Sequence, residues 1–212
     1  PHEREMRRYG RPAIGSGLVF PIPEEQLTVP SFPIPDHWPR IAGIDFGYDH
    51  PTAVVWCAYD PEEELTYIYD CYRMSKAPPS THAAAIRSRP GFIPIAWPHD
   101  GNRKDSMGNP GLAEQYRALG CNFLPFLFEN PPAVGETKGG NSVEVGIMEI
   151  YQRMSNNKFF VFSELTDWFE EFRMYHRKDA KIVSLRDDLM SATRYAVMSL
   201  RFGMAGGDPQ WT

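Results

Sequence analysis

The sequence predicts an α/β fold in which a mixed sheet is flanked by helices, and two observations lead to this prediction. Three strand-like segments joined by short loops follow one another from residue 40 to residue 72, which favours an antiparallel meander. Strand-like and helix-like segments then alternate between residues 80 and 126, a pattern typical of parallel strands joined by crossover helices. A mixed sheet with helices packed on it accommodates both patterns.

The first 39 residues differ from the rest because they are rich in proline. Proline fixes φ and removes a backbone donor, so residues 1–39 predict an extended arm or interdomain linker without a helix or a central strand. One domain is expected over residues 40–203. The glycine-containing residues 204–212 are expected to form a flexible tail.

Each element of the domain is expected from its apolar periodicity and from the turn residues that bound it. Glycines at positions 120 and 203 are expected to stop helices, and a turn at residues 178–181 suggests a hairpin. The expected strands are 41–47, 52–59, 65–72, 92–97, 122–126 and 159–162, and the expected helices are 80–87, 111–119, 143–154, 164–175 and 186–201.

Composition excludes several classes of protein. The 42% hydrophobic content is spread along the chain, the mean hydropathy is −0.43, and no run approaches the roughly 20 apolar residues of a membrane span, so no membrane partner is expected. Three cysteines without a CxxC pair indicate neither a disulfide framework nor a zinc knuckle. The net charge of −5 argues, taken alone, against a sequence-blind DNA coat.

Three positions place carboxylates where strands or helices end or begin. Asp45 lies in an otherwise apolar strand, and the flanking Gly43 and Gly47 allow another backbone to approach closely. Asp100 follows a predicted parallel strand, the usual place for catalytic groups in α/β folds, and Asp187–Asp188 open the last helix. Each has a structural alternative: a turn cap at Asp45, an Asp-Gly turn at Asp100 and an N-cap at Asp187.

Clustered carboxylates repel one another, and a metal ion between them relieves the repulsion. We therefore expect Asp45, Asp100 and Asp188 to be metal ligands, with Asp187 as a helix cap or an outer neighbour. An all-oxygen set without His or Cys ligands selects Mg²⁺ or Mn²⁺ over zinc. Two such ions about 4 Å apart can activate water and stabilise the leaving oxygen in phosphodiester cleavage.

Basic residues are segregated along the chain. There is no Lys or Arg between residues 41 and 72, whereas basic residues outnumber acidic ones between residues 172 and 201. Such a stretch can follow a phosphate backbone, and the alternative is a solvated face with helical ion pairs. His99, next to Asp100, is a further candidate for a hydrogen bond to substrate or to a carboxylate outside the ligand set. The candidate DNA contacts are His99, Arg103, Lys104, Arg177, Lys178, Lys181, Arg186 and Arg194.

Three motifs together resemble the nuclease domain of the large terminase subunit of tailed double-stranded DNA phages, close to the branch of phages P22 and Sf6. They are IAGIDFGY at residues 41–48, WPHDG at residues 97–101 and RDDLMSATRYA at residues 186–196. The resemblance spans about residues 40–202. It implies an RNase H-like fold with a mixed sheet of five or more strands, first an antiparallel meander and then parallel strands.

The resemblance also implies a function. Members of this family cut concatemeric viral DNA at the start and end of packaging with two divalent metal ions, and by position Asp45, Asp100 and Asp188 would be the ligands, with Asp187 beside them. Many relatives carry a third acidic residue where this chain has Ser191, which implies that the second ion is held more weakly. Implied partners are double-stranded DNA, an N-terminal ATPase motor domain in the full-length protein, the portal and the small terminase subunit, in the host cytoplasm.

The chain opens without Met and contains no P-loop, as expected of a nuclease fragment that begins near the interdomain linker. The leading hypothesis is therefore a metal-dependent DNA endonuclease. The alternatives are a Holliday-junction resolvase or transposase-like nuclease of the same fold, an actin-like or sugar-kinase ATPase suggested by the glycines around Asp45, and a non-catalytic DNA clamp or motor-docking module.

Overall fold

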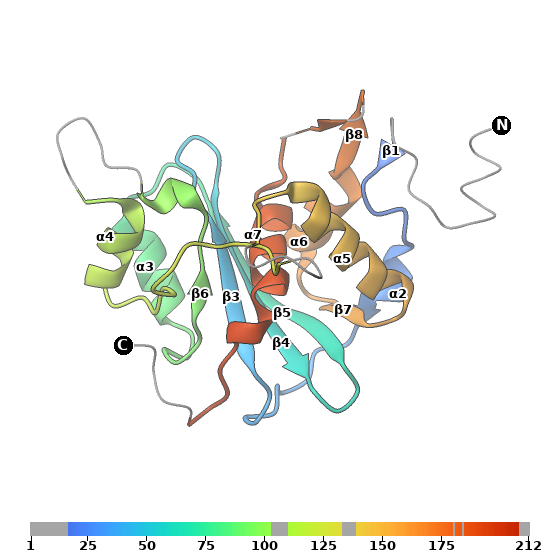
Figure 1. Ribbon diagram of the computed structural model, residues 1–212, viewed down its shortest axis with the longest axis horizontal. Coiled ribbons are helices and arrows are strands. Elements are labelled where there is room, and N and C mark those ends of the chain that lie inside the picture. The colour runs from blue at the N-terminus through green and yellow to red at the C-terminus, as the bar shows by residue number, and fades with distance from the viewer. Residues whose placement is uncertain (1–16, 103–109, 133–138, 180, 184, 208–212) are drawn as a thin grey trace.

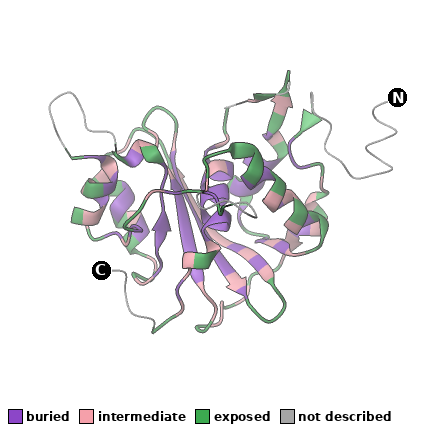
Figure 2. Cartoon of the chain, in the orientation of Figure 1, coloured by how far each residue is buried: buried purple, intermediate pink, exposed green. Residues whose placement is uncertain are grey.

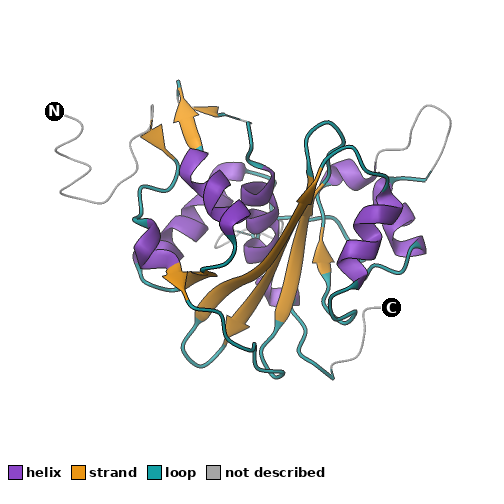
Figure 3. Ribbon diagram, turned by 180° about the vertical axis from the view of Figure 1, so that it is seen from behind, coloured by secondary structure: helices purple, strands orange, loops and turns teal. Residues whose placement is uncertain are grey.

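A computed structural model describes residues 17–102, 110–132, 139–179, 181–183 and 185–207 of the chain. Its core is a mixed sheet of six strands in the order β2-β7-β5-β4-β3-β6 (Figure 1). Seen from behind, in Figure 3, the central strands lie in front of α7. Among the described residues, no helix combines the length and the apolar character needed to cross a bilayer.

The predicted meander forms the centre of the sheet. Strands β3 (Arg40–Asp45), β4 (Thr52–Asp60) and β5 (Leu65–Met74) pair antiparallel in sequence order. β4 is buried over nearly its whole length, so both of its faces are covered. This burial explains why its sequence is a continuous apolar run and does not alternate between polar and apolar residues.

Parallel strands extend the meander on both sides. β6 (Ile95–Ala96) pairs with β3, β7 (Phe159–Phe162) pairs with β5, and β2 (Thr28–Val29) pairs with β7. A second, three-stranded sheet has the order β1-β8-β9 and combines β1 (Gly17–Leu18), β8 (His176–Lys178) and β9 (Lys181–Ile182). The predicted hairpin around residues 178–181 is confirmed by the antiparallel pairing of β8 and β9.

The helices match the predicted ones to within a few residues. α7 lies against the middle of the sheet, α3 and α4 lie on the β6 side, and α5 and α6 lie on the β7 side (Figure 1). Figure 2 shows that α7 and the central strands are mostly buried. The helix bounds are α3 (Pro79–Arg87), α4 (Leu112–Ala118), α5 (Val143–Ser155), α6 (Thr166–Met174) and α7 (Asp188–Met198), with 3₁₀ turns η1 (His99–Asn102) and η2 (Leu200–Phe202).

Two predicted strands are shorter than expected. Only Ile95–Ala96 of the predicted 92–97 segment is a strand, because Pro94 offers no amide to the ladder. The predicted strand at 122–126 is reduced to one parallel bridge between Ile95 and Phe123. Backbone hydrogen bonds still hold the two segments together, since the Ile95 amide donates to the Asn122 carbonyl and the Leu124 amide donates to the Ile95 carbonyl.

The N-terminal segment is the largest departure from the sequence prediction. The prediction of no helix in residues 1–39 is wrong, because α2 (Glu24–Leu27) forms one helical turn there. The side chains of Val19, Phe20 and Leu27 are buried in the core. Residues 17–39 therefore pack on the body of the molecule and do not extend from it as an arm.

The C-terminal helix and tail also differ in detail. α7 begins at Asp188 and not at residue 186, because Arg186 has a positive φ of 55°. Met204, assigned to the flexible tail, is 5% exposed and pairs with Arg40 through two backbone hydrogen bonds. Residues 208–212 lie outside the described part of the chain, as do residues 1–16.

Candidate metal centre

Asp45 is the last residue of β3, at the end of the sheet where the chain turns back into β4. The turn is tight at Gly47, where a Cβ atom would lie 2.4 Å from the His50 carbonyl oxygen. No side chain larger than hydrogen fits there without a shift of the backbone. The turn thus ends β3 directly after Asp45 and keeps its carboxylate at the sheet edge.

Close packing of α7 on β3 brings Asp188 to the same edge. A Cβ atom at Gly43 would lie 2.1 Å from the Ala192 carbonyl oxygen and 2.6 Å from the Ala196 amide nitrogen. The helix backbone therefore rests directly on the strand backbone, as the glycine flanks of Asp45 predicted. With this contact fixed, the N-terminal end of α7, where Asp187 and Asp188 lie, faces the end of β3.

Asp100 reaches the site on the 3₁₀ turn η1, which follows β6. A Cβ atom at Gly101 would lie 2.6 Å from the Trp97 ring and 2.9 Å from the Phe46 ring. The turn therefore sits on Phe46, the residue directly after Asp45. His99 Nε2 lies 3.1 Å from Asp100 Oδ1, so His99 contacts the carboxylate of a predicted ligand itself.

The carboxylates act on one another electrostatically. Burial is the main cause that raises the pKa of Asp45 to about 7; Asp188 and Asp187 raise it further, Arg194 opposes them, and Asp100 adds a smaller effect. Burial also raises the pKa values of Asp187 and Asp188, and the His50 side chain opposes the rise at both. The four aspartates predicted from the sequence therefore form one interacting cluster.

The sequence did not predict three residues near this cluster. His50, in the turn after β3, acts on both Asp187 and Asp188. Tyr195, on α7, has a pKa raised mainly by burial and further by Asp45 and Asp100. Glu171, on α6, is fully buried and accepts the Leu189 amide at 2.7 Å through its Oε2 atom. The RDDLMSATRYA motif contained Tyr195, whereas no local pattern marked Glu171.

Of the two roles expected for Asp187, helix cap or outer neighbour of the ligands, side-chain capping is not found. Asp187 occupies the N-cap position of α7, but its side chain makes no capping hydrogen bond. The capping acceptor is the Glu171 carboxylate, which reaches α7 from the neighbouring helix. Both carboxylates of the Asp187–Asp188 pair are thus available to the site.

The candidate DNA contacts fall into different environments. Arg177 is engaged by Glu144 in two hydrogen bonds of 2.7 and 2.6 Å, and Arg186 is 3.0 Å from Glu170. Lys178 and Lys181 are exposed partners across the β8–β9 hairpin. Arg103 and Lys104 lie outside the described residues.

The prediction that Arg194 contacts DNA is wrong, because the residue is buried. It is 7% exposed, and its guanidinium lies over the rings of Phe128 and Tyr195 at 5.4 and 4.5 Å. Its aliphatic stem fills the space above Gly146 of α5, where a Cβ atom would lie 2.5 Å from Arg194 Cγ. Arg194 therefore offsets the charge of Asp45 from inside the protein and does not line the surface.

The donor chemistry of the cluster fits a hard divalent cation. Four carboxylates suit Mg²⁺ or Mn²⁺, whose binding would relieve the mutual repulsion that adds to burial in raising the pKa of Asp45. Within the part of the chain that the structure describes, no three His, Cys, Asp or Glu side chains form a preassembled metal-binding group. The carboxylates would have to turn toward one another to share an ion.

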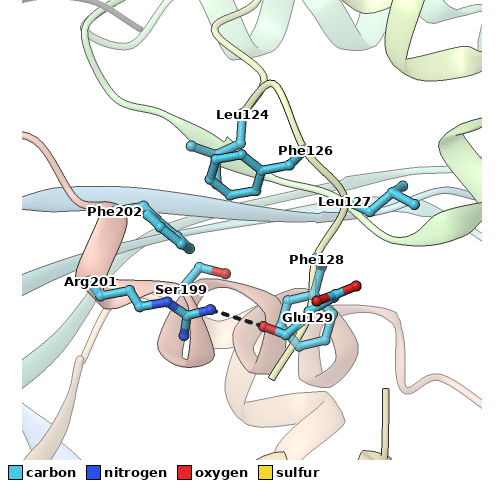
Figure 4. Close-up of a pocket in the computed structure, with 8 residues that line it drawn as sticks. All are labelled: Leu124, Phe126, Leu127, Phe128, Glu129, Ser199, Arg201 and Phe202. Carbon is cyan, nitrogen blue, oxygen red and sulfur yellow. Dashed lines mark hydrogen bonds between the residues drawn. The ribbon is translucent and has the colours of Figure 1, made fainter. Parts of the chain in front are cut away.

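A cavity of about 430 Å³ lies elsewhere, at the C-terminal end of α7. Figure 4 shows its lining, in which the Phe126 and Phe202 rings lie on one side and Arg201 donates to the Glu129 carbonyl oxygen at 3.3 Å. Asp188 is the first of the 11 residues of α7 and the cavity lies beyond the last, which separates them by about 16 Å at 1.5 Å per residue. The cavity is thus distinct from the carboxylate cluster.

Comparisons with known proteins agree with this architecture. The family model of the terminase RNaseH-like domain matches residues 42–200. The large terminase subunit of Salmonella phage P22 is 40% identical over 202 residues, which cover 95% of this chain and 39% of that protein. The chain thus spans about two fifths of the length of the curated relatives it matches.

Solved structures show the same fold. The P22 large terminase nuclease domain matches with a TM-score of 0.80 at 36% identity, covering 92% of this chain and 97% of that one. The large terminase nuclease domain from bacteriophage SPP1, solved with bound Mn, matches with a TM-score of 0.55 at 18% identity, covering 84% and 98%. The predicted RNase H-like fold is confirmed, and the chain belongs to the terminase RNaseH-like domain family.

Proposed function

We propose that this chain is the endonuclease domain of a viral DNA-packaging terminase, which cuts concatemeric phage DNA at the start and end of packaging. The observation that carries the proposal is the electrostatic cluster of Asp45, Asp100, Asp187 and Asp188 at one edge of the sheet. Family membership supports it, as does the Mn bound in the SPP1 nuclease domain. The reaction is metal-dependent hydrolysis of a phosphodiester bond.

Asp45, Asp100 and Asp188 would hold the divalent ions, with Asp187 beside them. When bound, Mg²⁺ or Mn²⁺ supplies an activated water and stabilises the charge on the leaving oxygen. The chain itself orients the ligands. The close contact at Gly43 fixes α7 on β3, and the His99 imidazole lies 3.1 Å from the Asp100 carboxylate.

Two features of the chain modulate the site. Ser191 stands one helical turn after Asp187, where an acidic residue would add another oxygen ligand, so the second ion would be held more weakly. Arg194 is a buried cation that offsets part of the carboxylate charge before any ion binds.

Double-stranded DNA is the proposed substrate, and the exposed Lys178 and Lys181 on the β8–β9 hairpin are the strongest candidates for phosphate contacts. Arg177 and Arg186 would have to leave Glu144 and Glu170 to join them. The proposed partners in the full-length protein are an N-terminal ATPase motor domain, the portal and the small terminase subunit, and the proposed location is the host cytoplasm.

Plasmid cleavage tests the proposal. The purified chain is incubated with supercoiled plasmid and Mn²⁺, and Asp45→Ala is compared with Glu62→Ala, which removes an exposed carboxylate from the turn at the other end of β4. Loss of a metal ligand should remove several kcal/mol of transition-state stabilisation and slow cleavage on the order of 1,000-fold. The Glu62 variant should cut like the wild type. Equal cleavage by both variants would contradict the assignment of Asp45 as a metal ligand. No cleavage by the wild-type chain with Mn²⁺ would favour a non-catalytic docking module.

A further inference from the structure

A chain of contacts connects the two elements that carry the metal-ligand candidates. Asp45 on β3 is the register partner of Ala53 on β4, and Ala53 is the register partner of Arg73 on β5. Register partners in antiparallel strands point to the same face of a sheet. Asp45 and Arg73 therefore project from one row, on the face that α7 covers.

Arg73 continues this chain into the helices. Its Nη1 atom donates to Glu171 Oε1 at 3.0 Å, while Nη2 contacts Asp167 and Glu170. The other Glu171 oxygen, Oε2, accepts the Leu189 amide at 2.7 Å. The Glu171 carboxylate is thus held from both sides, by a cation fixed to the sheet and by the first turn of α7.

The burial of Glu171 makes this contact energetically important. Its side chain is 0% exposed, whereas the neighbouring Glu170 is 41% exposed. A buried carboxylate that loses one partner leaves a charge without compensation, which is far more costly than the loss of a surface pair. Charge-assisted hydrogen bonds in such a place also hold a fixed geometry, so they can define the position of the helix end.

We propose that Glu171 and Arg73 form a positioning pair for the metal centre. Glu171 caps α7 in place of the N-cap residue Asp187, so both aspartates remain available to the site and Asp188 is held at a defined place relative to Asp45. This inference rests on the proposed function, because it assigns the pair to the metal site. Neither residue touches the substrate; they act through the position of α7.

Metal binding separates this role from a purely structural one. Mn²⁺ affinity is measured by calorimetry, and Leu189 amide exchange by NMR, for the wild type, Glu171→Gln and Glu170→Gln. In Glu171→Gln, the side-chain amide would place a donor where one of the two carboxylate oxygens now accepts. We expect about 10-fold to 100-fold weaker Mn²⁺ binding, the usual effect of losing a residue that orients ligands, with faster Leu189 exchange and an unchanged circular dichroism spectrum.

Glu170→Gln is the matched control, since Glu170 also contacts Arg73 from the same helix, while its other partner, Arg186, precedes α7 and the Leu189 amide is bound by Glu171. It should bind Mn²⁺ within about threefold of the wild type. If Glu171→Gln does not fold, Arg73→Lys is used to test the inference. Lysine keeps the positive charge but lacks the guanidinium group that donates to Glu171 and its neighbours. Weaker Mn²⁺ binding by Arg73→Lys supports the inference.

The experiment distinguishes a failure of the positioning role from a failure of the proposed function. A folded Glu171→Gln or Arg73→Lys variant that binds Mn²⁺ as tightly as the wild type would overturn the positioning role and leave the proposed function intact. A wild-type chain that binds no Mn²⁺ would overturn the proposed function and, with it, the assignment of the pair to a metal site. In that case, faster exchange of the Leu189 amide in Glu171→Gln would show that Glu171 caps α7 without any role at a metal site.

Discussion

The two ends of α7 are opposite environments on one continuous helix. At the N-terminal end, Asp187 and Asp188 lie near Asp45, and burial together with mutual repulsion raises the pKa of Asp45 to about 7. At the C-terminal end, Phe202 packs against Phe126 beside an apolar cavity. The difference indicates that repulsion between carboxylates is concentrated at the N-terminal end of α7, where the metal site is proposed, while the middle and the C-terminal end hold the helix in place.

Disrupting the contact between the middle of α7 and β3 should have the largest effect on stability. Gly43→Ala would place its Cβ atom 2.1 Å from the Ala192 carbonyl oxygen, so α7 must move away from β3. We expect a loss of about 3 kcal/mol or more in the free energy of unfolding, at or above the upper end for overpacked cores, with loss of Mn²⁺ binding as Asp188 moves. Urea denaturation monitored by circular dichroism measures the first effect.

Gly91→Ala is the matched control for that variant. No heavy atom lies within 4 Å of a Cβ built there. The change should leave stability within about 0.5 kcal/mol of the wild type, or raise it slightly by restricting the unfolded chain. Equal stability of the Gly43 and Gly91 variants would show that the strand and the helix are not in direct contact.

Removing charge from the N-terminal end should stabilise the metal-free protein. The pKa of Asp45 is raised from 3.8 to about 7, so the folded state binds a proton that the unfolded state has lost between these values. The contribution of Asp45 to stability therefore falls as the pH rises from about 4 to about 7 and stays low above that. Asp187 and Asp188, whose pKa values are also raised, act in the same direction.

Asp45→Asn removes the largest part of this dependence. In EDTA at pH 8 we expect Asp45→Asn to unfold at a higher urea concentration than the wild type. Its free energy of unfolding should be larger by on the order of 2 kcal/mol, and at pH 4 this difference should nearly vanish. Glu62→Gln, which removes an exposed carboxylate, should follow the wild-type pH profile. If the stability difference between Asp45→Asn and the wild type did not grow from pH 4 to pH 8, the raised pKa of Asp45 would be contradicted.

The sequence predicted the elements whose signals are local and missed contacts that depend on distant packing. The β3–β5 meander follows from apolar runs and turns, and Asp45 stood out because a charge in such a run requires compensation. Leu27 could not be placed in the core, because proline content describes the local backbone and not what packs against it. Arg194 is basic in sequence but buried in space, because Gly146 of another helix leaves room for its stem.

Glu171 shows the same limit at the site itself. It lies on an amphipathic helix among other acidic residues, where the ordinary expectation is exposure to solvent. Only the arrangement of α6 against α7 turns it toward the Leu189 amide. The sequence indicated the metal-ligand candidates because each was expected at the end of an element. The residue that caps α7 comes from a different element, α6, and no such local signal marks it.

The smallest effect is expected at the apolar end of α7, where Phe126 is 39% exposed and its ring centroid lies 4.7 Å from that of Phe202. Phe126→Ala removes one half-exposed ring from a tilted aromatic pair, so we expect a loss of about 1 kcal/mol in the free energy of unfolding. Mn²⁺ affinity and the pH profile should not change, because the whole of α7 separates this ring from Asp188. Calorimetric titration with Mn²⁺ and urea denaturation on the same sample check both statements. A weaker Mn²⁺ affinity in this variant would mean that the helix transmits a displacement along its length, and the two ends would then have to be treated as one coupled unit.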